Sequence, residues 1–290
     1  MNSINYKDKL TIIIVSFHSN HIIENLIHKL DKNIKIFIIE NSLDIEIKKN
    51  LEKKFSNVKV IIPEKNLGNG GGINLGFSFV KTEFSLYLDV DTVPEHDMIQ
   101  VLIEKANKIK NFSILAPKVT NFFYSKDLYI DHEKNKKIHK MKFITGCVLL
   151  FNMKALLKIG YFDENIFLYY EEHDLYYRCH KMDLPIYLID DAKVLHQGSS
   201  SVSIENNHEI HINRNWHYCW SKFYYFKKNF GYLFGIKKTI PNFVRAIRKY
   251  LFYSIKMDKK NALLHKAEIQ GLISSYCLRK SFRRPEVNFN

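Results

Sequence analysis

Apolar runs alternate with segments of helical spacing through the first third of the chain. The apolar runs predict buried strands at 10–17, 35–39, 58–62 and 84–88, and the spacings between them predict helices at 20–30, 45–55 and 73–80. This alternation is typical of an α/β fold whose strands form a Rossmann-like, mostly parallel sheet flanked by helices. In such folds ligands bind outside the carboxyl ends of the strands.

Polar side chains stand where these strands end. His18 follows the first strand, Glu40 and Asn41 follow the second, and Asp89 and Asp91 follow the segment LYL. In extended backbone Asp89 and Asp91 point to the same side, so their charges repel unless a cation or hydrogen bonds hold them. The alternative is a loop whose aspartates cap the next helix, because Thr92–Pro94 resembles a helix start.

A glycine-rich segment, KNLGNGGGINLGF, precedes the third predicted helix. Five glycines in residues 68–76 allow close approaches that side chains would block, and a helix beginning near Ile73 would present N–H groups to an anion. A merely flexible turn is the alternative. The segment lacks the G-K-[ST] of a P-loop and the third glycine of a dinucleotide fingerprint, so neither motif is expected.

Residues 119–142 are polar and lysine-rich, and we expect either an irregular excursion or a hairpin there, after which regular secondary structure resumes. The pattern predicts a strand at 142–151, a helix at 152–158, a turn at 160–163, a helix at 171–181 with Leu175 and Cys179 inward, and strand segments at 186–189 and 193–195 that end at His196. Glu171, Glu172 and Asp174 open the helix at 171–181. An exposed acidic first turn is one interpretation. The aromatic flanks favour partly desolvated acids with raised pKa values, suited to proton abstraction.

The net charge of +14 resides in the C-terminal quarter. Residues 211–290 carry 17 Lys and Arg against three acids, whereas the first 210 residues carry 27 of each sign. We therefore expect a domain of residues 1–210 and a basic, aromatic, helical region of residues 211–290. This region could bind nucleic acid, lie on an anionic membrane as a pair of amphipathic helices, or be an ordinary helical subdomain.

Composition excludes several classes of protein. The opening residues lack a signal-peptide pattern, and no run approaches the roughly 18 apolar residues of a membrane span. The four cysteines form no C-x-x-C pair, which disfavours a zinc knuckle or a disulfide framework. We expect a cytoplasmic protein, and the sequence indicates no oligomeric state.

Five ordered blocks carry a resemblance to a known family: IIIVSFHSN, IIENS, NLGNGGGINLGF, LYLDVDTVP, and the segment TGCVLLF…EEHDLYYRC followed by VLHQGSSS. Together they resemble GT-A glycosyltransferases of family 2, in the rhamnosyltransferase-like, polysaccharide-assembly branch, over residues 10–205.

The resemblance implies a nucleotide-sugar site. Asp89 and Asp91 would bind Mg²⁺ or Mn²⁺ on the donor diphosphate, and His196 would supply a further metal ligand. The nucleotide sugar would contact the residues that the matched blocks place around it, which are Phe17, His18, Glu40, Asn41, Asn66, Gly71 and Asn74. Glu40 departs from the pattern, since Asp is commoner there.

The resemblance also implies the reaction. An inverting, metal-dependent enzyme would transfer a hexosyl or deoxyhexosyl group, such as rhamnosyl, to a glycan or lipid-linked glycan in bacterial surface polysaccharide synthesis. Glu172, where Asp is commoner, would be the base, with Glu171 and Asp174 as competing candidates. The basic region would hold the enzyme on the inner face of the cytoplasmic membrane, and no nucleic acid is expected. The rival function is a non-catalytic, basic nucleic-acid-binding protein.

Overall fold

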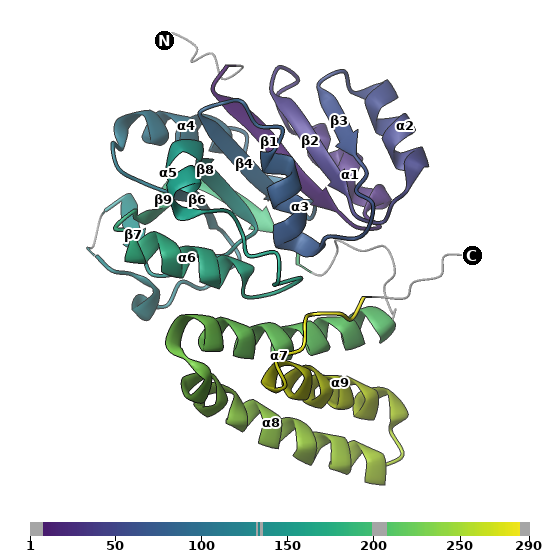
Figure 1. The fold of residues 1–290 in the computed structure, drawn as a ribbon. Helices are drawn as coiled ribbons and strands as arrows, with labels where there is room; N and C mark the ends of the chain where they lie inside the picture. The colour runs from purple at the N-terminus through teal and green to yellow at the C-terminus, as the bar shows by residue number, and fades with distance from the viewer. Residues whose placement is uncertain (1–7, 132, 134–135, 199–207, 285–290) are drawn as a thin grey trace. The chain divides into compact units, whose positions relative to one another are not determined.

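A computed structural model describes residues 8–131, 133, 136–198 and 208–284 (Figure 1). The chain divides into two compact units. The first comprises Met1–Leu67, Gly71–Phe162 and Leu175–Ser203, and the second comprises Gly68–Gly70, Asp163–Asp174 and Ile204–Asn290. The second unit therefore takes two short segments from the N-terminal part of the chain as well as the basic C-terminal region. A domain border at residue 210 stays a prediction.

The N-terminal half of the sheet is parallel, as the alternation predicts. Strands lie in the order β3 (Val58–Ile61), β2 (Lys35–Glu40), β1 (Leu10–Ser16) and β4 (Phe84–Asp89), side by side in Figure 1. Helices α1 (Asn20–Ile27) and α2 (Ile45–Lys54) connect the first three strands. The side chains of Ile12, Ile13 and Ile14 are all fully buried, so both faces of β1 are covered, which explains its continuous apolar run.

Helix α3 (Gly68–Phe77) begins five residues before the predicted start at Ile73. Two of its glycines, Gly72 and Gly76, serve close packing within the first unit. A Cβ on Gly76 would lie 2.7 Å from Ile13 Cγ2, and one on Gly72 would lie 3.0 Å from Val15 Cγ1. Larger residues at these positions would push α3 away from β1, so the flexible-turn interpretation is wrong here.

The second half of the sheet is mixed. It contains β5 (Thr92–Pro94), β6 (Ile114–Val119), β7 (Ile138–Met141), β8 (Val148–Asn152) and β9 (Ile186–His196), with β6 and β9 parallel and the pairs β4–β8, β6–β8, β5–β9 and β7–β9 antiparallel. Helices α4 (Met98–Lys108), α5 (Met153–Ile159) and α6 (Glu171–Lys181) and the 3-10 helix η1 (Lys126–Leu128) lie between these strands in the chain.

Three local predictions are corrected here. Thr92–Pro94 is a strand and not a helix start, because it pairs with Val194–His196. The strand predicted at 142–151 is Val148–Asn152. The two predicted segments at 186–195 form the single strand β9. Leu175 and Cys179 are fully buried, as predicted for α6.

The described part of the C-terminal region forms three helices: α7 (His208–Phe230), α8 (Tyr232–Ile255) and α9 (Lys259–Tyr276). They pack against one another within the second unit, around Trp216, Trp220 and Phe223. The described part of this region is thus a three-helix bundle with its own core, as the helical-subdomain alternative predicts, and it has one helix more than the alternative of two amphipathic helices. None of the helices in the described parts of the chain is both long and apolar enough to cross a membrane. The predicted class, an α/β fold with a basic helical C-terminal region, is confirmed.

Candidate metal and nucleotide-sugar site

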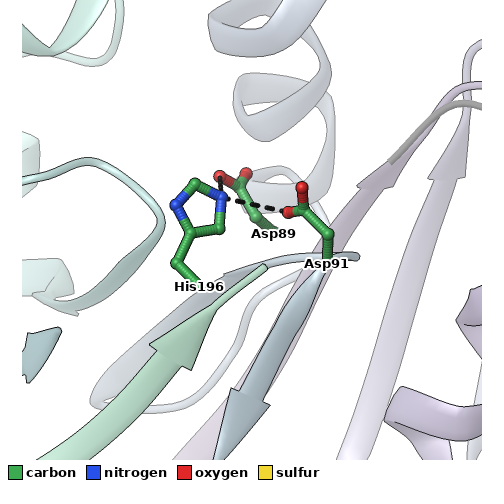
Figure 2. Close-up of side chains that lie close together, drawn as sticks. All are labelled: Asp89, Asp91 and His196. Atoms are coloured by element: carbon green, nitrogen blue, oxygen red, sulfur yellow. Dashed lines mark hydrogen bonds and ion pairs between the residues drawn. The ribbon is translucent and has the colours of Figure 1, made fainter. Parts of the chain in front are cut away.

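Asp89, Asp91 and His196 converge in the first unit (Figure 2). Asp89 is the last residue of β4, and His196 is the last residue of β9. The short strand β5 brings the two strand ends together, because Thr92 pairs with His196. His196 Nε2 lies 3.1 Å from Asp91 Oδ1 and 3.8 Å from Asp89 Oδ2.

Residues around this cluster fix its geometry, and the sequence analysis did not single them out. The Tyr87 hydroxyl donates to Asp89 Oδ1. Asn121 Nδ2 donates to the His196 carbonyl at 2.7 Å, and its Oδ1 accepts from the His196 N–H at 3.3 Å. A tyrosine two residues before the first aspartate, on the same side of its strand, was the available signal for Tyr87. Ser199–Ser201 of the VLHQGSSS block lie outside the described residues.

The two carboxylates act on the ionisation of their neighbours. The hydrogen bond with Asp91 raises the pKa of His196 and outweighs the opposing effect of burial. Burial raises the pKa of the Cys147 thiol to about 12, and the negative charge of Asp89 adds to this rise. The thiol beside the cluster is therefore protonated at neutral pH.

The cluster has a donor set that fits a divalent cation. One ligand atom from each of the three side chains lies within 4.8 Å of the others. Two carboxylates and one imidazole suit Mg²⁺ or Mn²⁺, and Asp91 is only 4% exposed. Helix α4 begins at Met98, so Asp89 and Asp91 do not cap it and the capping alternative is wrong.

The residues predicted around the nucleoside follow β1 and β2. The Phe17 and His18 rings lie 4.4 Å apart, and burial lowers the pKa of His18 to about 4. Glu40 is fully buried, which raises its pKa, and it accepts from the Ser42 N–H at 2.8 Å. Asn41 Oδ1 accepts from the Leu67 N–H at 3.2 Å. Glu40 and Asn41 thus fix the backbone at Ser42, just after β2, and at Leu67, just before α3.

The predicted residues of the glycine-rich segment have different local roles. Both polar atoms of the Asn74 amide bond the backbone of Phe162, at 2.9 and 3.0 Å, so this side chain joins α3 to the chain after α5. Gly71 is buried, and a Cβ there would lie 3.2 Å from Leu67 Cβ. Asn66 is half-buried in the preceding turn. Contact of these three residues with a nucleotide sugar stays a prediction.

The three acids at the start of α6 belong to the second unit, and two of them are engaged in packing contacts there. Asp174 is fully buried and lies 2.8 Å from Lys228 Nζ. Glu171 is 4% exposed, and its Oε1 accepts from Asn69 Nδ2 at 3.0 Å. The Glu172 side chain is 22% exposed and lies 3.5 Å from His173 Nδ1. Of the three acids, Glu172 is the most accessible to a substrate.

The mixed α/β sheet with its flanking helices has the GT-A fold of solved glycosyltransferases. The model of the family described as Glycosyl transferase family 2 matches residues 11–172. This match covers more than half of the chain, and the chain belongs to that family. The predicted membership of family 2 is thereby confirmed, whereas the rhamnosyltransferase-like, polysaccharide-assembly branch stays a prediction.

Named relatives support the same class. The chain is 22% identical over 229 residues to the low-salt glycan biosynthesis hexosyltransferase Agl10 of Haloferax volcanii, a match that covers 71% of this chain and 73% of that protein. It resembles the mannosyltransferase PcManGT from Pyrobaculum calidifontis in complex with GDP-Man and Mn²⁺, with a TM-score of 0.56 and 10% identity over 92% of this chain and 86% of that chain.

A third relative is a larger protein. GalNAc-T7 with UDP, GalNAc and Mn²⁺ has a TM-score of 0.56 and 13% identity over 76% of this chain. The match covers 50% of that chain, so this protein corresponds to half of the length of GalNAc-T7. At these identities the likeness to both solved structures shows the fold.

Proposed function

We propose that this protein is a metal-dependent, inverting glycosyltransferase that takes its sugar from a nucleoside diphosphate sugar. The observation that carries the proposal is the cluster of Asp89, Asp91 and His196 at the carboxyl ends of β4 and β9. Ligands of open α/β sheets bind at this edge. Solved relatives contain UDP or GDP-Man together with Mn²⁺, which supports the same donor class for this chain.

Asp89, Asp91 and His196 would hold the cation, either Mg²⁺ or Mn²⁺. When bound, such a cation offsets the charge that builds up on the leaving diphosphate. Phe17, His18, Glu40 and Asn41 would line the nucleoside side of the donor, and Asn66, Gly71 and Asn74 the side of the glycine-rich segment.

Glu172 is the proposed general base. It accepts the proton of an acceptor hydroxyl while the hydroxyl oxygen bonds to the anomeric carbon and the bond to the diphosphate oxygen breaks. This displacement inverts the anomeric configuration. The exposure of Glu172 supports the choice, since Asp174 is committed to Lys228 and Glu171 accepts a hydrogen bond from Asn69.

The proposed product is a glycan or lipid-linked glycan of bacterial surface polysaccharide, with a hexosyl or deoxyhexosyl group transferred. The relative from Haloferax volcanii is named as a hexosyltransferase of glycan biosynthesis, which supports a glycan acceptor. The proposed location is the cytoplasmic face of the membrane, with the basic C-terminal region toward anionic lipid. The charge of that region, 17 Lys and Arg against three acids, supports this placement.

A panel of nucleoside diphosphates and sugar nucleotides tests the proposal. Each compound is added with Mn²⁺, with Mg²⁺ or with a chelator, and thermal unfolding and donor hydrolysis are measured. A donor should raise the unfolding temperature and be hydrolysed only with metal, because a ligand that binds only the native state stabilises it. RNA binding that needs no metal, with no hydrolysis of any donor, would support the nucleic-acid-binding rival.

A further inference from the structure

Helix α8 exposes a stripe of five aliphatic residues that two basic residues interrupt. Seven residues, which we call the outer stripe, recur at intervals of three or four and so share one face: Leu233, Lys237, Ile240, Val244, Arg248, Leu251 and Ile255. Its five aliphatic members are between 47% and 84% exposed, with Leu233 at 82% and Ile255 at 84%. An ordinary surface helix carries polar residues on such a face.

The opposite face of α8 already provides the packing that the bundle needs. Gly235, Thr239 and Ala246 are buried there. A Cβ on Gly235 would lie 2.9 Å from the Phe223 ring of α7, and Thr239 Oγ1 is hydrogen-bonded to the Tyr276 hydroxyl at 2.9 Å. The outer stripe is therefore a second apolar face that the core of the bundle does not use.

The charges of α8 all have one sign. The helix carries Lys237, Lys238, Arg245, Arg248 and Lys249 and contains no Asp or Glu, and Lys256 follows its last residue. Lys237 and Arg248 lie within the outer stripe, and the other three basic residues of the helix lie to one side of it by helical spacing. Long basic side chains beside an apolar stripe are the pattern of a helix that lies in a bilayer interface.

We infer that α8 binds an anionic lipid bilayer, with the aliphatic residues of the outer stripe among the acyl chains and its basic residues at the headgroups. The inference deepens the proposed function, on which it rests for its setting, by naming the surface that reaches the lipid. A second copy of the chain is the less suitable occupant. Pairing two copies of this face would bring together the positive charges of Lys237 and Arg248 from both copies, with Lys238 and Lys249 to one side and Arg245 already paired with Glu268, whereas anionic headgroups neutralise such charges.

Vesicle flotation with the full chain tests the inference. The apolar variant combines Leu233→Gln, Leu251→Gln and Ile255→Gln. Its matched control replaces three comparably exposed aliphatic residues of other helices, Ile45, Leu157 and Leu263, with Gln. The charge variant combines Lys237→Gln and Arg248→Gln. Its control replaces two exposed lysines outside α8, Lys32 and Lys53, with Gln. Vesicles contain phosphatidylcholine alone or equimolar phosphatidylcholine and phosphatidylglycerol.

The wild-type chain should bind the anionic vesicles in preference to phosphatidylcholine. The apolar variant should bind them at least about tenfold more weakly. The charge variant should lose about fivefold for each residue replaced. That second loss should shrink between about 0.1 and about 1 M salt, where the Debye length falls from about 10 to about 3 Å. Both control variants should bind like the wild type.

Three results would overturn the inference. The first is a loss in the control variants that equals the loss in the α8 variants. The second is full binding by the apolar variant, which would reduce α8 to a general basic patch. The third, seen by light scattering, is a wild-type dimer that the apolar variant converts to monomers, which would assign the stripe to a second copy. Nucleotide-dependent thermal shifts in the same samples show separately whether the transferase proposal holds.

Discussion

Lys228 Nζ lies 2.8 Å from Asp174 Oδ1 and 2.8 Å from Asp163 Oδ2. One lysine of α7 thus serves two carboxylates, and Asn229 Nδ2 adds a hydrogen bond to Asp174 Oδ1 at 3.1 Å. Burial is the largest single effect on the pKa of Asp163 and raises it, but the hydrogen bonds from Lys228 and Asn165 and the positive charge of Lys228 together outweigh burial, so the pKa lies below its ordinary value. A basic residue of the C-terminal region therefore holds the first turn of α6, two residues from Glu172.

Lys228→Met should destabilise the second unit by about 2–4 kcal/mol. The change leaves the fully buried Asp174 without its cation, although the Lys228 side chain is 32% exposed and water offsets part of the loss. Urea unfolding followed by tryptophan fluorescence measures this effect, since both tryptophans of the chain lie in α7. The control is Lys49→Met, which breaks an exposed pair with Glu46 and should cost at most about 1 kcal/mol. Equal effects of the two changes would contradict this account of Lys228.

Asp91→Asn should abolish the metal-dependent part of nucleotide binding. It keeps the size of the side chain but removes the charge of the most buried carboxylate in the cluster. His196→Ala should weaken metal dependence less, because carboxylate oxygens suit Mg²⁺ and Mn²⁺ better than imidazole does. Calorimetric titration with UDP and GDP, with and without Mn²⁺, measures both effects.

Tyr87→Phe gives a finer test of the same cluster, because it removes only the hydroxyl that donates to Asp89. Loss of such an outer contact typically costs about 10- to 100-fold in metal affinity. Asp97→Asn, an exposed change at the start of α4, is the control.

Metal-dependent binding that survives in Asp91→Asn would remove Asp91 from the proposed ligands.

Glu172→Gln should lower turnover by about 10²–10⁴-fold, because the amide cannot accept the proton of the acceptor hydroxyl. Donor affinity should change little, since the base acts on the acceptor. Glu172→Asp should lower turnover less, as the charge remains and only the reach shortens. Initial rates of sugar transfer, with donor affinity measured in parallel, provide the test.

Glu171→Gln and Asp174→Asn are the comparison variants for that assay. If either abolishes turnover while Glu172→Gln leaves it near normal, the base is misassigned although the enzyme class survives. Asp174→Asn is expected to act mainly on stability, through its contact with Lys228.

His217 should make the second unit less stable in acid. It is fully buried in α7, and this burial lowers its pKa to about 3. The neutral ring is well satisfied, since Nε2 donates to the Arg283 carbonyl at 2.9 Å and Nδ1 accepts from the Ser281 hydroxyl at 3.2 Å. Below about pH 6.5 the unfolded chain binds a proton that the folded chain does not, so stability falls as pH falls.

The contribution of His217 to this slope is at most about 1.4 kcal/mol per pH unit. His217→Gln should flatten the fall between about pH 6.5 and pH 4, whereas His211→Gln, at an exposed position of the same helix, should leave it unchanged. Unfolding by urea at a series of pH values measures the slope. An unaltered slope in His217→Gln would refute this role for His217.

Local sequence patterns correctly predicted the strands that are buried along most of their length. The starts of β1, β2 and β4 follow the apolar runs, because a strand covered on both faces needs apolar residues throughout. Helix α6 begins and ends where its spacing predicts. The pairing of Thr92–Pro94 with Val194–His196 was not predicted, because it joins segments about a hundred residues apart and three residues carry no periodicity.

The sequence likewise predicted some residues of the candidate site and missed others. Asp89, Asp91 and His196 were predicted, but from the resemblance to a family, since spacing alone left a capping loop open. The role of Lys228 was missed, because two of the three interpretations of the basic region assigned its charges to external partners and the third, a helical subdomain, named no ion pair. The available signal was Asp174 itself, an acid on the inward side of an aromatic helix, since a buried carboxylate requires a cation or several donors.

The acidic turn of α6 gains its partners from a part of the chain that the ribosome makes later. Ser221 donates a hydrogen bond to the Leu168 carbonyl, 53 residues earlier in the chain. Tyr224 donates to Asp163, 61 residues earlier, and Lys228 donates to Asp174, 54 residues earlier. At about 5–20 residues per second, Lys228 is added about 3–10 s after Asp174. All nine strands of the sheet precede α7 in the chain, so their synthesis is complete before Lys228 exists. The order of translation therefore places the fixing of this turn after the synthesis of the whole sheet and before that of α8 and α9.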